Sequence, residues 1–244
     1  MESQRGLRRL PGQRGEPRDV GLRGRRGVSA AAFRPRLVYV YDALCPWCYA
    51  FTPVVQALVR HYGDRFDHEV ISGGMVRGDQ VREIGGEEEA RELRESYRSI
   101  TSLTGAQFGE AFFNNVATRR RRLDSEPPAI ALAAFRMIAP ERSQLDLAHA
   151  LLRENFWEGG DPTSEAFYRA IAEKLGLDPE AFLDAMGTDE ARDLALYDFS
   201  LARQLGADAF PRLYLQTAED YLYLVSRGYS AFDDVQRIID EIGV

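Results

Sequence analysis

The chain has 244 residues, of which 45% are hydrophobic, and its formal net charge is −7. This is enough apolar content for one domain with a packed core, or for one domain with a large insertion. No run of eighteen apolar residues occurs, so we expect no membrane-spanning helix. The acidic balance argues against nucleic acid as the main partner.

Residues 1–36 differ in composition from the rest of the chain. They hold ten arginines against three acidic residues, a balance of +7, so the remaining residues carry −14. The segment is rich in Gly and Pro and lacks the apolar stretch of a secretory signal. We expect a disordered extension, with a targeting segment or a tether to nucleic acid or membrane as the alternatives. Without a secretory signal, the cytoplasm is the expected location.

The first predicted elements are a strand over residues 37–41 and a helix that begins at Pro46 and runs to about Tyr62. Proline is favoured at the first helical position because it has no N–H to satisfy there. Cys45 then lies at the junction between strand and helix. The unpaired N–H groups and the dipole of the helix favour a thiolate at that position.

Cys45 and Cys48 are the two cysteines of the sequence, three positions apart. A Cys45 thiolate can attack a disulfide, and Cys48, one helical turn later, can resolve the mixed disulfide. A zinc site would need two more ligands, and the three histidines, His61, His68 and His149, form no close pair. A structural disulfide closing so short a loop would add little stability. The pattern predicts a dithiol redox site without metal or other cofactor.

A second strand over residues 66–71 completes a βαβ unit whose two strands should be parallel. Between residues 79 and 206 we find helical patterns and no strand pattern, which predicts an all-helical segment. Within it, the run from Arg119 to Arg122 indicates either a solvated helix end or a contact to an anion or substrate.

The chain returns to strands near its C-terminal end. Strands over residues 211–216 and 221–226 should form a β-hairpin, and a helix over residues 232–242 follows. The predicted order is therefore a βαβ unit, a long helical segment, a hairpin and a final helix.

Two stretches resemble the thioredoxin-like superfamily, and specifically the DsbA family near its FrnE-like branch. The first runs from Tyr41 to Tyr49 and contains the sequence Cys-Pro-Trp-Cys. The second runs from Ala209 to Leu215, where the family has its cis-proline. Between them, residues 155–161 and the helix after them are similar to the helical insertion of the family. The resemblance covers about residues 37–244.

The resemblance implies an α/β fold, namely a thioredoxin fold with a large all-helical, DsbA-like insertion. Residues 37–78 and 207–244 would form the thioredoxin-like domain, and residues 79–206 the insertion subdomain. It also implies a thiol–disulfide oxidoreductase that reduces, oxidises or isomerises disulfides by exchange. The expected partners are thiols and disulfides of proteins or small molecules, glutathione among them, and neither nucleic acid nor membrane.

Two other functions stay open at this point. A glutathione-dependent isomerase or transferase of related architecture is one, although those relatives carry serine in place of the dithiol. A non-catalytic adaptor is the other, although it would not need both cysteines. The sequence leaves the substrate, the recycling partner, the direction of exchange and the oligomeric state undetermined.

The resemblance assigns substrate binding to Pro46, Trp47, Phe210 and Pro211. Pro211 resembles the cis-proline whose preceding residue faces the dithiol and offers its backbone to an extended substrate. Phe210 would make the substrate groove apolar. Trp47 either forms an apolar platform beside the sulfur or packs against the insertion. Strongly oxidising members carry a histidine inside the motif, and Trp47 supplies no such charge, so we expect a milder oxidant.

Asp42, three residues before Cys45, has two interpretations. Its carboxylate could carry a proton to or from a cysteine, which makes it a possible proton shuttle. Alternatively it is a turn residue that accepts hydrogen bonds from nearby backbone N–H groups, and we favour this second role.

Overall fold

The computed structural model describes residues 33–243. The disordered extension predicted for residues 1–36 therefore lies outside the described residues except for its last four, and Arg36 already belongs to the first strand. No helix in the described part is long and apolar enough to cross a membrane.

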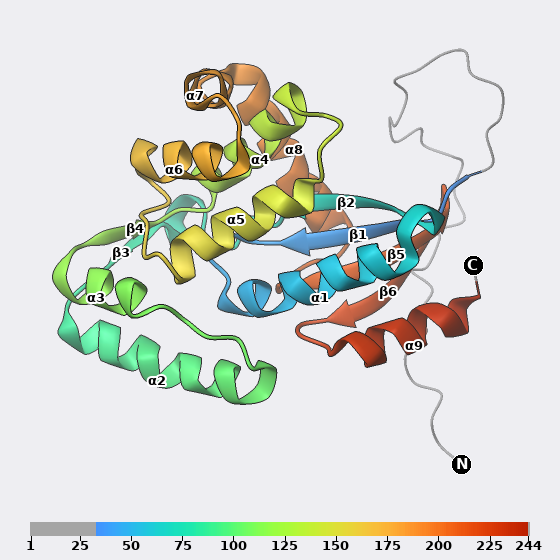
Figure 1. Cartoon of the computed structure of the whole chain (residues 1–244), viewed down its shortest axis with the longest axis horizontal. Coiled ribbons are helices and arrows are strands. Elements are labelled where there is room, and N and C mark those ends of the chain that lie inside the picture. Colours follow the sequence, from blue (N-terminus) through green and yellow to red (C-terminus); the bar gives the residue numbers. More distant parts are fainter. Residues whose placement is uncertain (1–32, 244) are drawn as a thin grey trace.

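In the part of the chain that the structure describes, the main sheet has four strands in the order β2-β1-β5-β6 (Figure 1). Strand β1 (Arg36–Tyr41) pairs in parallel with β2 (Asp67–Ser72). On its other side β1 pairs antiparallel with β5 (Arg212–Ala218), which pairs antiparallel with β6 (Tyr221–Arg227). The parallel βαβ unit and the C-terminal hairpin predicted from the sequence are both confirmed.

Side chains of β1 alternate between the two faces of the sheet, as the period of a strand requires. Tyr39 belongs to the core cluster shared with α1 (Pro46–Tyr62) and α9 (Phe232–Ile242). Val40 belongs to a second cluster on the opposite face, against the end of α8 (Asp189–Gln204). Because both faces are covered, β1 reads as a continuous apolar run rather than an alternating one.

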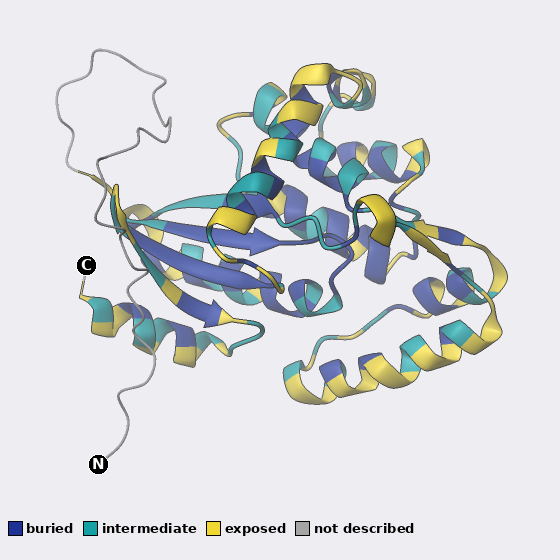
Figure 2. Ribbon diagram, turned by 180° about the vertical axis from the view of Figure 1, so that it is seen from behind, coloured by how far each residue is buried: buried dark blue, intermediate teal, exposed yellow. Residues whose placement is uncertain are grey.

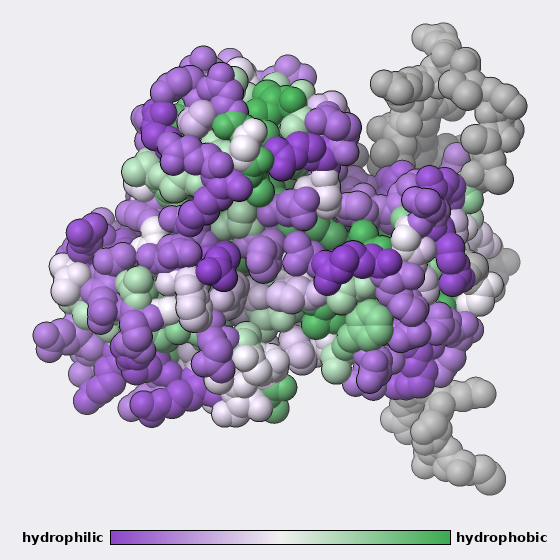
Figure 3. Space-filling model, viewed as in Figure 1, coloured by the Kyte–Doolittle hydropathy of each residue, from purple (hydrophilic) through white to green (hydrophobic). Residues whose placement is uncertain are grey.

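The segment between β2 and β5 is mainly helical. Its helices are α2 (Glu87–Thr104), α3 (Glu110–Thr118), α4 (Glu126–Ile138), α5 (Gln144–Phe156), α6 (Glu165–Leu175), α7 (Pro179–Met186) and α8. Figure 2 shows that α2 is exposed along most of its length, whereas the two central strands of the main sheet, β1 and β5, are mostly buried. On the face drawn in Figure 3, hydrophilic residues predominate and apolar ones show only in scattered areas.

The prediction that residues 79–206 contain no strand is wrong at two short places. Strand β3 (Arg82–Ile84) pairs antiparallel with β4 (Arg121–Leu123), apart from the main sheet. Each strand has three residues and two of them are charged, so no apolar alternation marks either one in the sequence. The two strands form because they pair with each other within the insertion.

A buried ion pair fastens the insertion to the main sheet. Arg136 of α4 donates two hydrogen bonds to the carboxylate of Asp198 of α8, over 2.9 Å and 2.8 Å, and another to the carbonyl of Val70. The same carboxylate accepts the N–H of Ser72, at the end of β2, over 3.0 Å. Two helices and one strand therefore share one charge pair.

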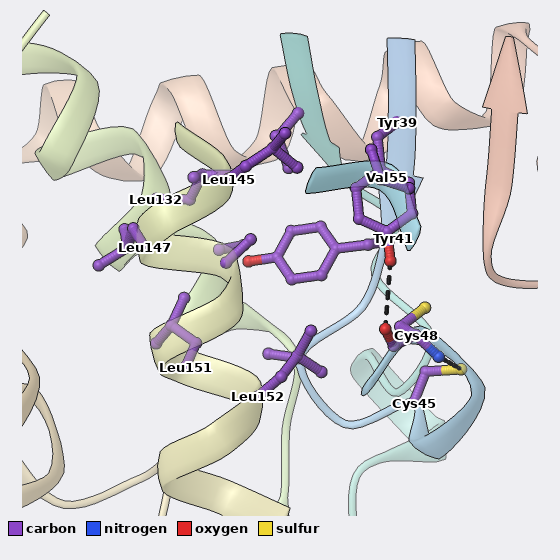
Figure 4. Packing of buried hydrophobic residues seen from close by; sticks show 14 of the residues in the cluster. Tyr39, Tyr41, Cys45, Cys48, Val55, Leu132, Leu145, Leu147, Leu151 and Leu152 are labelled. Carbon is purple, nitrogen blue, oxygen red and sulfur yellow. Dashed lines mark hydrogen bonds between the residues drawn. The ribbon is translucent and has the colours of Figure 1, made fainter. Parts of the chain in front are cut away.

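Apolar packing joins the sheet to α5. In Figure 4 the ring of Tyr41 extends from the end of β1 toward leucines of the insertion. The labelled leucines are Leu132 of α4 and Leu145, Leu147, Leu151 and Leu152 of α5, all fully or almost fully buried. Helix α5 also packs against α1, so that the insertion lies next to the helix that carries the cysteine pair.

Candidate active site

Cys45 is the N-cap residue of α1, as the sequence predicts. Its backbone is extended, with φ −91° and ψ 114°, and Pro46 is the first residue of the helix. The Cys45 sulfur accepts the N–H of Cys48 over 3.4 Å. The first turn of the helix therefore directs an N–H group at this sulfur, a contact that an attacking thiolate could also accept.

The two cysteines are free thiols, and both lie below the surface, with 3% of Cys45 and 0% of Cys48 exposed. The Cys48 sulfur accepts the N–H of Asp42 over 3.4 Å. Burial chiefly, and then the neighbouring Cys45, raise the pKa of the Cys48 thiol well above its ordinary value. The Cys48 sulfur therefore lies one helical turn behind the sulfur at the helix end, in surroundings that disfavour its ionisation.

Tyr39 supports the first turn of α1 from below, a role that we did not foresee from the sequence. Its hydroxyl lies 3.4 Å from the carbonyl oxygen of Cys48 (Figure 4). The same hydroxyl lies 3.0 Å from Oγ1 of Thr52. Thr52 donates to the same carbonyl over 2.8 Å. The sequence did contain one signal for this contact, a tyrosine within a predicted buried strand, because a buried hydroxyl group needs a hydrogen-bond partner.

Phe210 lies opposite Cys45, just before β5. The Phe210–Pro211 peptide bond is cis, and the Cys45 thiol donates to the Phe210 carbonyl over 3.6 Å. A Cβ on Gly73 would lie 2.1 Å from a carbon of the Phe210 ring. Only a glycine at position 73 leaves room for this ring in its present position.

The chain around Pro211 is held by two further contacts. Buried Arg212 donates through Nε to the carbonyl of Ala209 over 3.1 Å and also pairs with Asp208. The N–H of Gly228, at the end of β6, donates to the Pro211 carbonyl over 2.9 Å. These contacts fix the backbone that faces Cys45.

The two motif residues between the cysteines lie in the first turn of α1. Pro46 and Trp47 are both partly buried, and Trp47 packs against the main core cluster. That contact agrees with the packing interpretation of Trp47, while its exposed part remains available to a bound molecule.

Asp42 is buried, and its carboxylate binds backbone N–H groups. One oxygen accepts from Leu44 over 2.9 Å and the other from Met75 over 2.7 Å. Burial raises the pKa of Asp42, and these N–H groups act in the opposite direction. The carboxylate thus makes the contacts of a turn residue, and the group of Asp42 that contacts Cys48 is its N–H. The shuttle role stays a prediction.

No cluster of three metal-ligating side chains occurs within residues 33–243. Tyr49 and its neighbours form an aromatic cluster beside the dithiol instead. The ring of Tyr49 lies 5.3 Å from that of Phe108 and 5.5 Å from that of Phe156, between centroids. The cluster joins the first turn of α1 to the end of α5.

Comparison with known proteins gives relatives in sequence and in structure. No family model matches the chain. Among curated proteins it is similar to the ClpXP adapter protein SpxH of Halalkalibacterium halodurans, with 25% identity over 183 residues. The match covers 73% of this chain and 58% of that protein, so the chain spans less than two thirds of the length of this relative.

Solved structures of similar fold cover more of the chain. A candidate protein disulfide isomerase from Nitrosomonas europaea has a TM-score of 0.73 and 23% identity, over 86% of this chain and 97% of that one. The cytosolic disulfide reductase DsbM from Pseudomonas aeruginosa has a TM-score of 0.69 and 23% identity, over 85% and 98%. A second structure of DsbM contains GSH. The chain therefore has the fold of the DsbA-like proteins, a thioredoxin fold interrupted by a mainly helical insertion.

Proposed function

We propose that this protein is a thiol–disulfide oxidoreductase in which Cys45 attacks and Cys48 resolves. The observation that carries the proposal is the asymmetry of the two sulfurs. The Cys45 sulfur caps a helix and accepts an N–H group, whereas the Cys48 sulfur is buried behind it. We infer that the sulfur at the helix end attacks the substrate and that the sulfur behind it acts afterwards.

The proposed exchange has two steps. The Cys45 thiolate attacks one sulfur of a substrate disulfide, which forms a mixed disulfide and releases the other substrate sulfur as a thiolate. Cys48 then loses its proton and attacks the Cys45 sulfur, which releases the second substrate thiolate and leaves a Cys45–Cys48 disulfide. The substrate gains two electrons and the dithiol loses two. Two external thiols then reduce the Cys45–Cys48 disulfide back to the dithiol and are themselves oxidised to a disulfide, and the reverse sequence oxidises a substrate.

Phe210 and Pro211 support substrate binding in this scheme. When Cys45 ionises, its sulfur can no longer donate to the Phe210 carbonyl, and that oxygen is free to accept an N–H of an extended substrate. Pro46 and Trp47, on the other side of Cys45, would then border the bound molecule. Asp42, buried beside Cys48, is the candidate acceptor for the Cys48 proton.

Glutathione is the small thiol that we propose as a partner, and the cytoplasm as the location. Both proposals draw on the likeness to DsbM, which is described as cytosolic and has been solved with GSH. A reducing compartment keeps most dithiols reduced, so a reductase or isomerase role is favoured over net oxidation there. No cofactor other than the dithiol is required by this chemistry.

The likeness to an adapter protein supports a second candidate, in which the fold binds another protein without redox chemistry. The two candidates differ in their need for the cysteines. An adaptor would keep its function in a variant with serine at positions 45 and 48. An oxidoreductase would lose it.

The test is the rate at which the protein exchanges disulfides. The wild-type protein, Cys45→Ser and Cys48→Ser are each incubated with glutathione and a small mixed disulfide of glutathione, and release of the second thiol is followed. The wild-type protein should accelerate the release, and Cys45→Ser should return it to the uncatalysed rate. Equal rates for the wild-type protein and Cys45→Ser would exclude the proposed activity and favour the adaptor.

A further inference from the structure

The four-arginine run is divided by the structure. Arg119, Arg120 and Arg122 are exposed, as expected for a solvated helix end, but Arg121 is only 3% exposed. The cause is strand β4, in which Arg121 pairs with Ile84 of β3 and alternates in direction with its neighbours. A charge that the sequence places in a solvated run is therefore inside the protein.

The buried guanidinium of Arg121 is only partly satisfied. Its Nη2 donates to Oδ1 of Asn155 over 2.7 Å and to the carbonyl of Gly160 over 2.6 Å. Its Nε and Nη1 are buried and have no hydrogen-bond partner among the described residues. The group lies 5.2 Å from the centroid of the Phe112 ring. Burial lowers the pKa of Arg121, and Asp161 and Tyr97 oppose that effect from a distance.

No carboxylate of the described residues forms an ion pair with Arg121. A buried cation without a counter-charge is costly, and proteins normally pair it or give it a role. The negative group that interacts favourably with Arg121 therefore has to be sought outside these carboxylates.

A chain of buried hydrogen bonds leads from Arg121 to the dithiol. Asn155, which accepts from Arg121, donates through Nδ2 to the carbonyl of Ala43 over 3.1 Å. Ala43 belongs to the turn in which the N–H of Cys45 donates to the carbonyl of Asp42 over 3.1 Å. Ala43 and Asn155 are both buried. Two side chains of the insertion thus hold the turn that ends at Cys45.

Tyr97 of α2 belongs to the same buried cluster as Cys45, and its pKa depends on both Cys45 and Arg121. This tyrosine is buried in the aromatic cluster beside Cys45, with its ring 4.5 Å from that of Phe108 between centroids. Burial chiefly raises the pKa of Tyr97, an ionised Cys45 would raise it further, and Arg121 lowers it. An ionised Cys45 and the Arg121 guanidinium thus act on the pKa of Tyr97 in opposite directions.

We propose that Arg121 is a positioning residue for the dithiol, which holds the Cys45 turn through Asn155 and supplies the positive charge that favours the Cys45 thiolate. This inference rests on the proposed function. The thiolate exists in the reduced form and not in the disulfide, so a nearby cation stabilises the reduced form and makes the couple more oxidising. The interior screens this charge less than water would. The insertion would then supply the charge that Trp47 cannot supply within the motif.

Three substitutions separate charge from geometry. Arg121→Met removes the charge and keeps an apolar stem, Arg121→Lys keeps the charge, and Arg122→Met removes an exposed charge from the adjacent position as the matched control. Two quantities are measured on each reduced, full-length protein. They are the rate at which iodoacetamide alkylates Cys45 at mildly acidic pH and the equilibrium constant of the dithiol against glutathione.

Arg121→Met should slow the alkylation of Cys45 by roughly threefold to tenfold, because fewer sulfurs are ionised. The equilibrium with glutathione should shift by about the same factor toward the disulfide form of the protein. Arg121→Lys should stay close to the wild-type protein in both quantities, and so should Arg122→Met. If Arg121→Met reacts and equilibrates like the wild-type protein, or if Arg121→Lys is as impaired as Arg121→Met, the charge role is wrong.

Asn155→Asp provides a second test of the proposal, which remains informative if Arg121→Met fails to fold. The new carboxylate would pair with Arg121 and neutralise it, and it would also remove the Nδ2 donor that holds Ala43, so both parts of the proposal predict the same change. Alkylation of Cys45 should slow in this variant as it does in Arg121→Met, and an unchanged rate would overturn the proposal. A failure of the proposed function looks different, because the wild-type protein itself would then exchange disulfides no faster than Cys45→Ser.

Discussion

The sulfur of Cys45 lies 3.6 Å from the carbonyl oxygen of Phe210, a residue 165 positions further along the chain. In the thiol form this sulfur donates a hydrogen bond to the oxygen. After ionisation both groups are acceptors and repel each other, so the contact favours entry of a donor between them. In the proposed mechanism, a substrate N–H group would bind between this pair.

Cys45 should react before Cys48 with any small alkylating reagent. Its sulfur accepts an N–H group at the helix end, while burial keeps the Cys48 sulfur protonated. Alkylation of the reduced protein at mildly acidic pH, followed by peptide mass spectrometry, measures the order. Cys48→Ser should accumulate mixed disulfides because the resolving sulfur is gone. Faster labelling of Cys48 would contradict the assigned roles.

Resolution of the mixed disulfide should accelerate as the pH rises. Burial raises the pKa of Cys48, so little of it is ionised at neutral pH, and the ionised fraction grows about tenfold per pH unit until that pKa is reached. The measurement is single-turnover release of glutathione from a Cys45–glutathione mixed disulfide across a pH series. Cys48→Ser is the control and should release none by this route. A flat profile through neutral and alkaline pH would show that Cys48 ionisation does not limit the step.

Trp47→His should make the dithiol couple more oxidising. A partly protonated imidazole within the motif would favour the Cys45 thiolate and hence the reduced form. Trp47→Phe serves as the control, because it keeps an aromatic ring without a charge. The equilibrium constant against glutathione, measured for the three proteins, checks this. The expectation fails if the wild-type protein is already as oxidising as Trp47→His.

Asp198→Ala should destabilise the fold strongly. It would leave the guanidinium of Arg136 buried without its carboxylate and the N–H of Ser72 without its acceptor. We expect a loss of about 3–5 kcal/mol in the free energy of unfolding, measured by urea denaturation. Glu83→Ala breaks an exposed pair with Arg120 and should cost less than about 1 kcal/mol. Similar losses in the two variants would mean that the buried pair does not fasten the insertion.

Tyr41→Phe should leave the stability unchanged or raise it. The Tyr41 hydroxyl is buried and has no hydrogen-bond partner among the described residues, so its removal costs no bond. Tyr39 is the matched control, because its ring lies 5.7 Å from that of Tyr41 between centroids and its hydroxyl has partners. Tyr39→Phe should lose about 1 kcal/mol in the free energy of unfolding. A loss in Tyr41→Phe as large as that in Tyr39→Phe would contradict this assignment.

Local patterns were enough to predict the elements around the dithiol. An apolar run, then Cys-Pro-Trp-Cys, then apolar residues at spacings of three and four, determine a strand, a capped turn and a helix, because each depends on neighbours within one or two turns. The parallel βαβ unit, the hairpin and the DsbA-like fold are confirmed. The substrate-binding roles of Pro46, Trp47, Phe210 and Pro211 and the shuttle role of Asp42 stay predictions.

The short strands β3 and β4 have no such apolar pattern in the sequence, because most of their residues are charged. Strands β3 and β4 carry two charged residues out of three, and they form only because each finds the other across about forty residues of chain. Their pairing buries Arg121 while its neighbours stay in solvent. The sequence by itself determined that a positive run exists, and only the pairing of strands decided which of its side chains lies inside.

Contacts between distant residues complete the site. Three contacts depend on packing between separate elements: Phe210 before β5 faces Cys45, Asn155 of α5 holds Ala43, and Tyr39 of β1 supports Cys48. Such contacts depend on which faces of separate elements meet, and no spacing along the chain encodes this. The sequence determined a reactive dithiol at a helix end; the tertiary structure decided which charges, carbonyls and hydroxyls surround it.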